Sequence, residues 1–115
     1  MNRKQQILRQ RTRDQRTQRR ALKAIATGTP QTARTHLIAT GIDPTTAKRY
    51  APAFSRGITP TTTGETRIKL RGRRTKRVTV KLYDKTTFTD RLITYRPADP
   101  NVAARFQQAT HRLAA

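Results

Sequence analysis

Residues 29–54 have the sequence TPQTARTHLIATGIDPTTAKRYAPAF, and this stretch decides the fold of the chain. Its pattern predicts two short helices joined by a tight turn. Thr29 and Pro30 suit the start of the first helix, because threonine caps free N–H groups and proline has no N–H to leave unpaired. Gly41 suits the end of that helix, and Asp43 suits the start of the second. So short a connection predicts a steep angle between the two helices, as in a helix-turn-helix.

Apolar residues recur along one face of each expected helix. The first helix carries Ala33, Leu37 and Ile38 on one side. The second carries Ala47, Tyr50, Ala51 and Phe54, at spacings of three and four residues. The side chains that remain outward are Thr45, Thr46, Lys48 and Arg49. Hydroxyl and basic groups suit phosphate oxygens and base edges, so we predict that these four residues bind DNA.

The pair Gly41-Ile42, the Asp43-Pro44 start and the small Ala47 resemble the helix-turn-helix DNA-binding proteins in general. The resemblance is confined to the stretch quoted above, and it implies a recognition helix that enters the major groove of double-stranded DNA. The sequence departs from the usual pattern at Thr40, where an apolar residue is commoner. A plain helical hairpin with a solvated basic face therefore stays open as an alternative.

The overall charge of the chain favours a polyanionic partner. The 115 residues carry 26 Lys and Arg against 6 Asp and Glu, a net charge of +20. A chain with this charge repels itself, and nucleic acid is the natural counter-ion. The length predicts one small domain. We expect a cytoplasmic, nucleoid-associated protein without a membrane segment, because no stretch is apolar enough to span a bilayer.

The N-terminal residues are almost wholly polar. We predict that residues 1–17 form a flexible basic arm, which contacts phosphates or enters a minor groove, or else serves only as a solubilising tail. The arm's DNA-binding residues are predicted to be Arg9, Arg11, Arg13, Arg16, Arg19 and Arg20. After it, Leu22, Ile25 and Ala26 predict a third helix, so residues 18–54 form a three-helix unit.

A change of period marks the second half of the chain. Residues 55–65 form a linker punctuated by glycine and proline. Residues 66–70 and 77–83 then alternate apolar and polar side chains, which predicts two strands. Residues 87–96 are expected to be a third strand, which completes an antiparallel meander.

The basic loop between the first two strands is a second candidate DNA-binding element. In a winged helix, a hairpin that follows the recognition helix touches the DNA backbone or minor groove. Arg73, Arg74 and Lys76 at this tip suit that role. An exposed charged turn without such a role is the alternative, and so is a sheet that reads the major groove with its basic face.

The C-terminal residues predict an amphipathic helix with Val102, Phe106, Ala109 and Leu113 along one side. We expect this helix to cover the apolar face of the meander, although it would also suit a homodimer interface. The predicted fold class is therefore α+β. It comprises the helix-turn-helix unit and then, over residues 66–115, a three-stranded sheet packed by a C-terminal helix.

The sequence contains no pattern typical of catalysis. Cysteine is absent, and His36 and His111 lie far apart without acidic neighbours in a metal-binding spacing. We predict no enzyme activity, no metal and no cofactor. The expected function is that of a small double-stranded-DNA-binding protein, a transcriptional or replication regulator of phage, plasmid or mobile-element type. A structural, ribosomal-style RNA-binding protein and a non-specific nucleic-acid-packing protein are the alternatives.

Overall fold

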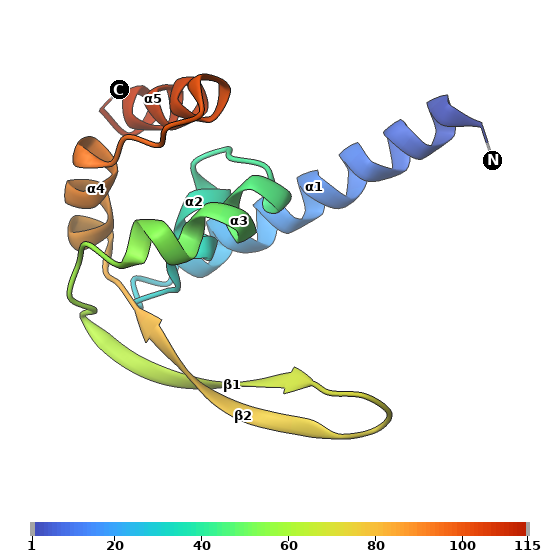
Figure 1. Cartoon of the computed structure of the whole chain (residues 1–115), viewed down its shortest axis with the longest axis horizontal. Helices are drawn as coiled ribbons and strands as arrows, with labels where there is room; N and C mark the ends of the chain where they lie inside the picture. The colour runs from blue at the N-terminus through green and yellow to red at the C-terminus, as the bar shows by residue number, and fades with distance from the viewer. Residues whose placement is uncertain (1, 115) are drawn as a thin grey trace.

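The computed structural model describes residues 2–114, and side-chain burial as far as residue 112. The elements in chain order are α1 (Arg3–Ala26), α2 (Ala33–Ala39), α3 (Pro44–Ser55), β1 (Thr62–Lys69), β2 (Thr75–Leu82), α4 (Lys85–Thr94) and α5 (Pro100–Ala114). Figure 1 shows the β1–β2 hairpin extending away from the helices, on the opposite side from α5. The N-terminal half of α1 projects from the remainder of the molecule.

The predicted three-stranded meander is wrong. The sheet has two antiparallel strands, and most of the expected third strand belongs to α4. The Asp84 carboxylate caps this helix by accepting a hydrogen bond from the Thr87 N–H at 2.7 Å. Phe88 and Leu92 are four residues apart and both are buried. Residues four apart share one face in a helix and also in a strand, so the spacing alone does not distinguish the two. The Asp84 cap does, because only a helix leaves free N–H groups at its start.

The two helices around Gly41 are present, with shifted boundaries. Thr32, not Thr29, caps α2 and accepts a hydrogen bond from the Thr35 N–H. Asp43 caps α3 as predicted. The backbone of Gly41 has φ +104°, which an L side chain rarely adopts, so the turn requires glycine.

An aromatic cluster holds α3, α4 and α5 together. The ring of Phe54 in α3 lies 5.4 Å from those of Phe88 and Tyr95 and 6.3 Å from that of Phe106 in α5. The expectation that the C-terminal helix covers the sheet is therefore wrong: Val102, Phe106 and Ala109 are buried among helices. With the third strand replaced by α4, the nearest apolar partners of α5 are aromatic side chains. The remaining predicted member of its stripe, Leu113, lies outside the described side chains.

Tyr83 ties the base of the hairpin to α2. Its backbone exchanges two hydrogen bonds with Gln31, of 2.8 and 3.0 Å. The Nε2–H of His36 also donates to the Tyr83 carbonyl at 2.6 Å, and the imidazole stacks on Phe88. His36 is buried, with 3% of its surface exposed. Because a carbonyl oxygen only accepts, this bond fixes which ring nitrogen is protonated.

The predicted arm lies in α1, whose N-cap is Asn2. Residues 2–13 are all exposed, and partial burial of the helix begins at Asp14. Ala21 is buried, whereas Leu22 is 49% exposed, so the expected apolar face of this helix was placed one residue too far along. The mobility of the arm in solution stays a prediction. Further along the chain, β1 starts inside the stretch that we had assigned to the linker.

We expect the free energy of unfolding to fall as the pH drops from neutral towards pH 5. Burial lowers the pKa of His36 below its ordinary value of 6.5, although the Tyr83 carbonyl and the charge of Asp84 oppose the shift. The unfolded imidazole therefore gains a proton before the folded one does, and acid favours the unfolded state. Thermal unfolding across this pH range measures the effect.

The matched control is His36→Gln, which cannot titrate there. Asp43 and Asp84 have pKa values lowered from 3.8, so these carboxylates stay ionised in the folded protein over this pH range. His111 is present in both proteins and cancels from the comparison. Equal pH slopes for the native chain and the variant would contradict the assignment to His36.

Candidate nucleic-acid interface

The outward face of α3 carries a stripe of exposed polar and basic residues. Thr45, Lys48 and Arg49 are exposed, and Pro52 and Arg56 continue the stripe at helical spacing. Pro52 lies on this solvent face, and α3 runs past it to Ser55. Three of the four predicted recognition residues therefore share one surface.

Thr46, the fourth predicted residue, does not belong to that surface. It is 9% exposed, and its hydroxyl donates to the Asp43 carboxylate at 2.9 Å. Arg105 of α5 donates to both of these groups, at 3.1 Å to Thr46 and 2.9 Å to Asp43. Burial raises the pKa of Asp43, but the hydrogen bonds from Thr46 and the charge of Arg105 outweigh it, so the pKa stays below its usual value. Thr46 thus fixes the start of α3 instead of facing a partner.

The turn before α3 is covered by α5. Arg112 donates a hydrogen bond to the Thr40 carbonyl at 2.9 Å. A side chain at Gly41 would collide with the guanidinium of Arg112. Together with the Arg105 bonds, these contacts restrain the turn from one side and leave the opposite side of α3 open.

An open groove of about 510 Å³ runs between α2, α3 and β2. The cations that line it are Arg34, Lys48, Arg56 and Lys81. All four are exposed and none of the lining residues is acidic. Guanidinium and ammonium groups that converge from three elements without a carboxylate form a surface for an extended anion.

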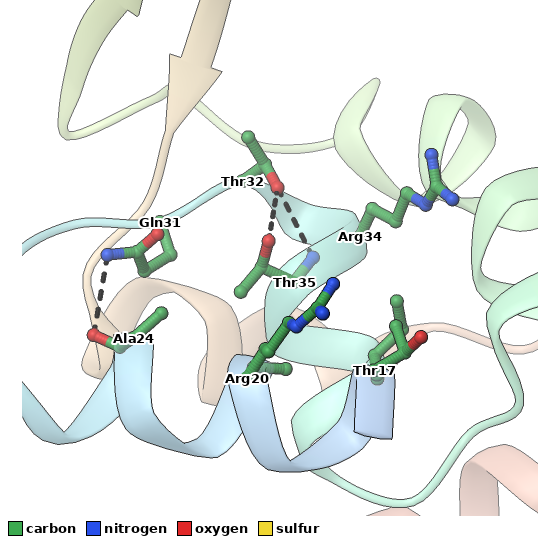
Figure 2. Close-up of a pocket in the computed structure, with 9 residues that line it drawn as sticks. Thr17, Arg20, Ala24, Gln31, Thr32, Arg34 and Thr35 are labelled. Atoms are coloured by element: carbon green, nitrogen blue, oxygen red, sulfur yellow. Dashed lines mark hydrogen bonds between the residues drawn. The ribbon is translucent and has the colours of Figure 1, made fainter. Parts of the chain in front are cut away.

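A second groove of about 440 Å³ adjoins the first, between α1 and α2. Figure 2 shows Arg20 of α1 near Thr17 and Thr35, whereas the guanidinium of Arg34 on α2 extends away from them. Arg34 lines both grooves, so the two sets of cations adjoin at this residue. We call the combined set the basic track, and it comprises Arg20, Arg34, Lys48, Arg56 and Lys81.

None of the six acidic residues lines either of these two grooves. Asp43, Asp84 and Asp99 each accept hydrogen bonds from the first backbone N–H groups of a helix. Asp14 and Asp43 line a different groove, between α1 and the turn. Within the described residues, the ion pairs are Arg105 with Asp43 and Arg77 with Glu65. Neither of these ion pairs includes a residue of the basic track.

The predicted hairpin loop lies at the free end of β1–β2. Arg73, Arg74 and Lys76 are all exposed there. The loop closes through a hydrogen bond from the Leu70 N–H to the Arg74 carbonyl at 2.9 Å. In Figure 1 this end is far from the helices, so the three cations are not part of the basic track but form a separate patch.

The predicted arm cations all lie in α1, as exposed side chains. Of the six, Arg20 lies on the basic track. Arg11 lines the groove that also contains Asp14. The structure thus connects the arm to the track at one residue only.

No sequence pattern predicted that Arg34, Arg56 and Lys81 would lie together beside α3. Lys81 belongs to the basic face of the predicted sheet, which was an alternative DNA-reading surface, but no spacing relates it to Arg34 or Arg56. Only the fold brings them to one groove. A search for basic residues on either side of the predicted recognition helix would not have found this groove, because basic residues occur along most of the chain.

The described residues contain no group of three His, Cys, Asp or Glu side chains that could hold a metal ion. Within the same residues, no helix is long and apolar enough to cross a membrane. Comparisons of the chain with protein families, curated proteins and solved structures found no match. The geometry of the basic track, α3 and the hairpin is therefore the basis for a functional proposal.

We expect Lys48→Ala and Arg56→Ala each to reduce the salt dependence of duplex-DNA binding. Loss of one phosphate contact lowers the slope of log affinity against log salt by about 0.9. Fluorescence anisotropy with a labelled duplex over a salt series measures this slope. Lys85→Ala and Arg96→Ala are the controls, because both residues are exposed cations outside the two grooves. The same slope change in all four variants would contradict a localised track.

Proposed function

We propose that the protein binds double-stranded DNA, with the outward face of α3 in a major groove and the basic track along the adjacent backbone. The observation that carries the proposal is the groove beside α3, where Arg34, Lys48, Arg56 and Lys81 converge without a carboxylate. Beside these phosphate-binding groups, Thr45 and Arg49 are free to meet base edges. Backbone contacts would position the helix, and these two side chains would read the sequence.

The length of the hairpin supports this arrangement. Eight residues in β1, at about 3.3 Å each, give an arm of roughly 26 Å. One turn of B-DNA measures about 34 Å, so the neighbouring minor groove is roughly 17 Å along the axis. The cations at the hairpin tip are therefore within reach of a groove next to the one that α3 occupies.

The biological role that fits this design is a sequence-directed regulator of transcription or replication, of phage, plasmid or mobile-element type. We propose that it acts at the nucleoid, as a binding protein and not as an enzyme. A homodimer would be required if the target is a palindrome, because operator symmetry mirrors protein symmetry.

RNA binding is the second candidate function. Double-stranded-RNA-binding domains have the order helix, three strands, helix, which the predicted recognition helix, three-stranded meander and C-terminal helix would match. That order is absent from the described residues, because α4 replaces the third strand. No observation therefore favours RNA over DNA, although the basic track suits the phosphates of either.

Selection from a pool of random duplex DNA, at about 0.15 M salt, tests sequence-directed binding. We expect a defined motif to be enriched. A pool that stays random while binding remains tight and salt-sensitive would contradict the proposal and leave a packing function.

Arg49→Ala separates base reading from phosphate contact. For the selected motif we expect a loss of about 1–3 kcal/mol in binding free energy, with little change on unrelated duplexes. Arg13→Ala is the control, because Arg13 is an exposed cation on the projecting half of α1. Competition binding measures both. If the two variants weaken all sequences equally, Arg49 does not read bases.

A further inference from the structure

The tip of the hairpin combines a dense positive charge with two apolar side chains. Most residues from 67 to 77 are Lys or Arg, and none is acidic. Within this segment stand Ile68 and Leu70, which are 43% and 44% exposed. Neither the basic track nor the reading of bases by α3 accounts for two apolar side chains in so polar a segment.

Ile68 and Leu70 lie on the same face of the hairpin. They are two residues apart, and Ile68 is paired with Lys76 on β2. Closer to the helices, the same face carries Val78, Val80 and Leu82, which are half-buried. Burial of this apolar face thus decreases towards the tip, where Ile68 and Leu70 are the most exposed of its apolar side chains.

The turn itself projects freely. Gly72 has φ +75°, and a Cβ atom at this position would meet no atom within 4 Å. All residues from 65 to 77 are exposed. Figure 1 shows this end of the hairpin well away from α4 and α5. A partner can therefore surround the tip without meeting the helices.

We infer that the hairpin tip enters the minor groove beside the α3 site, and that Ile68 and Leu70 wedge between base pairs so that the DNA bends. This inference rests on the proposed DNA-binding function and adds an architectural role to it. Arg and Lys side chains are attracted to the negative potential of a narrow minor groove. Apolar side chains inserted at a base step unstack it and bend the duplex towards the major groove by on the order of 20–90°.

The charge around the two apolar side chains favours DNA over a lipid surface. Lys76 lies directly opposite Ile68 on the same face, whereas Arg67, Lys69 and Arg71 alternate with the two apolar side chains and lie on the other face. A minor groove presents phosphates on both walls and base edges on its floor, which matches cations on both faces of a narrow hairpin tip. A peripheral membrane protein needs a broad apolar face, whereas the exposed part of this face has two apolar side chains beside Lys76.

The test is energy transfer between dyes at the two ends of a duplex of about 30 base pairs, combined with anisotropy on the same sample. Bending brings the ends together, so we expect transfer to rise when the full-length protein binds. In the double variant Ile68→Ala/Leu70→Ala most of that rise should be lost, while the affinity changes only a few-fold, because phosphate contacts remain. Leu22→Ala/Ile93→Ala is the matched control, since these side chains are 49% and 51% exposed on α1 and α4. This control should bend DNA like the native chain.

Each outcome points to one claim. Absence of binding by the native protein would overturn the proposed function itself. Binding without a rise in transfer, or a rise that survives in the hairpin variant, would overturn the bending inference and leave DNA binding intact. Co-sedimentation with vesicles that contain anionic lipid is run in parallel. If the hairpin variant loses vesicle binding while DNA bending is unchanged, the tip is a membrane contact and the inference fails.

Discussion

The packing of Phe54 is the interaction on which the position of α3 depends. Phe54 is fully buried near the end of this helix, and its ring meets rings from α4 and α5. Arg91 of α4 also donates to the Phe54 carbonyl at 2.9 Å and lies over the same ring. These contacts hold the apolar side of α3 against the C-terminal helices, so the opposite side, with Lys48 and Arg49, is turned outward. A recognition surface needs this rigidity, because base reading depends on a fixed helix.

A second anchor fixes the hairpin relative to α3. Tyr83 joins the end of β2 to α2 through Gln31 and His36, and the stack of His36 on Phe88 links this anchor to the aromatic cluster. The groove between α3 and β2 is therefore bounded by elements that share one core. The same arrangement explains how a chain of net charge +20 uses its few acids: three of them cap helices, where the partial positive charge of the N–H groups favours a carboxylate. Most of the cations are exposed, and we propose that their partner is a polyanion.

The parts that could be predicted are those that local chemistry decides. Gly41 and Asp43 marked the turn, because positive φ and capping leave clear signals in a sequence. The alternation from 77 to 83 marked β2. The helix at α4 was missed because its threonines, Phe88 and Ile93 favour a strand locally, and contact with Phe54 outweighs that preference. The basic track was missed for a related reason: residues distant in sequence meet only once the helices and the hairpin have packed. Thr46 was assigned to the surface because nothing in the sequence pairs it with Arg105.

Our proposal is that α3, the basic track and the separate patch at the hairpin tip contact one DNA duplex. Its most direct test is a titration of the isotope-labelled protein with duplex DNA at about 0.15 M salt, followed by amide chemical-shift mapping. We expect the chemical-shift changes to concentrate in residues 45–56, near Arg34 and Lys81, and in residues 67–77. The amide shifts of α5 should stay unchanged. Shifts confined to the projecting half of α1, or spread evenly over all basic segments, would contradict the proposal.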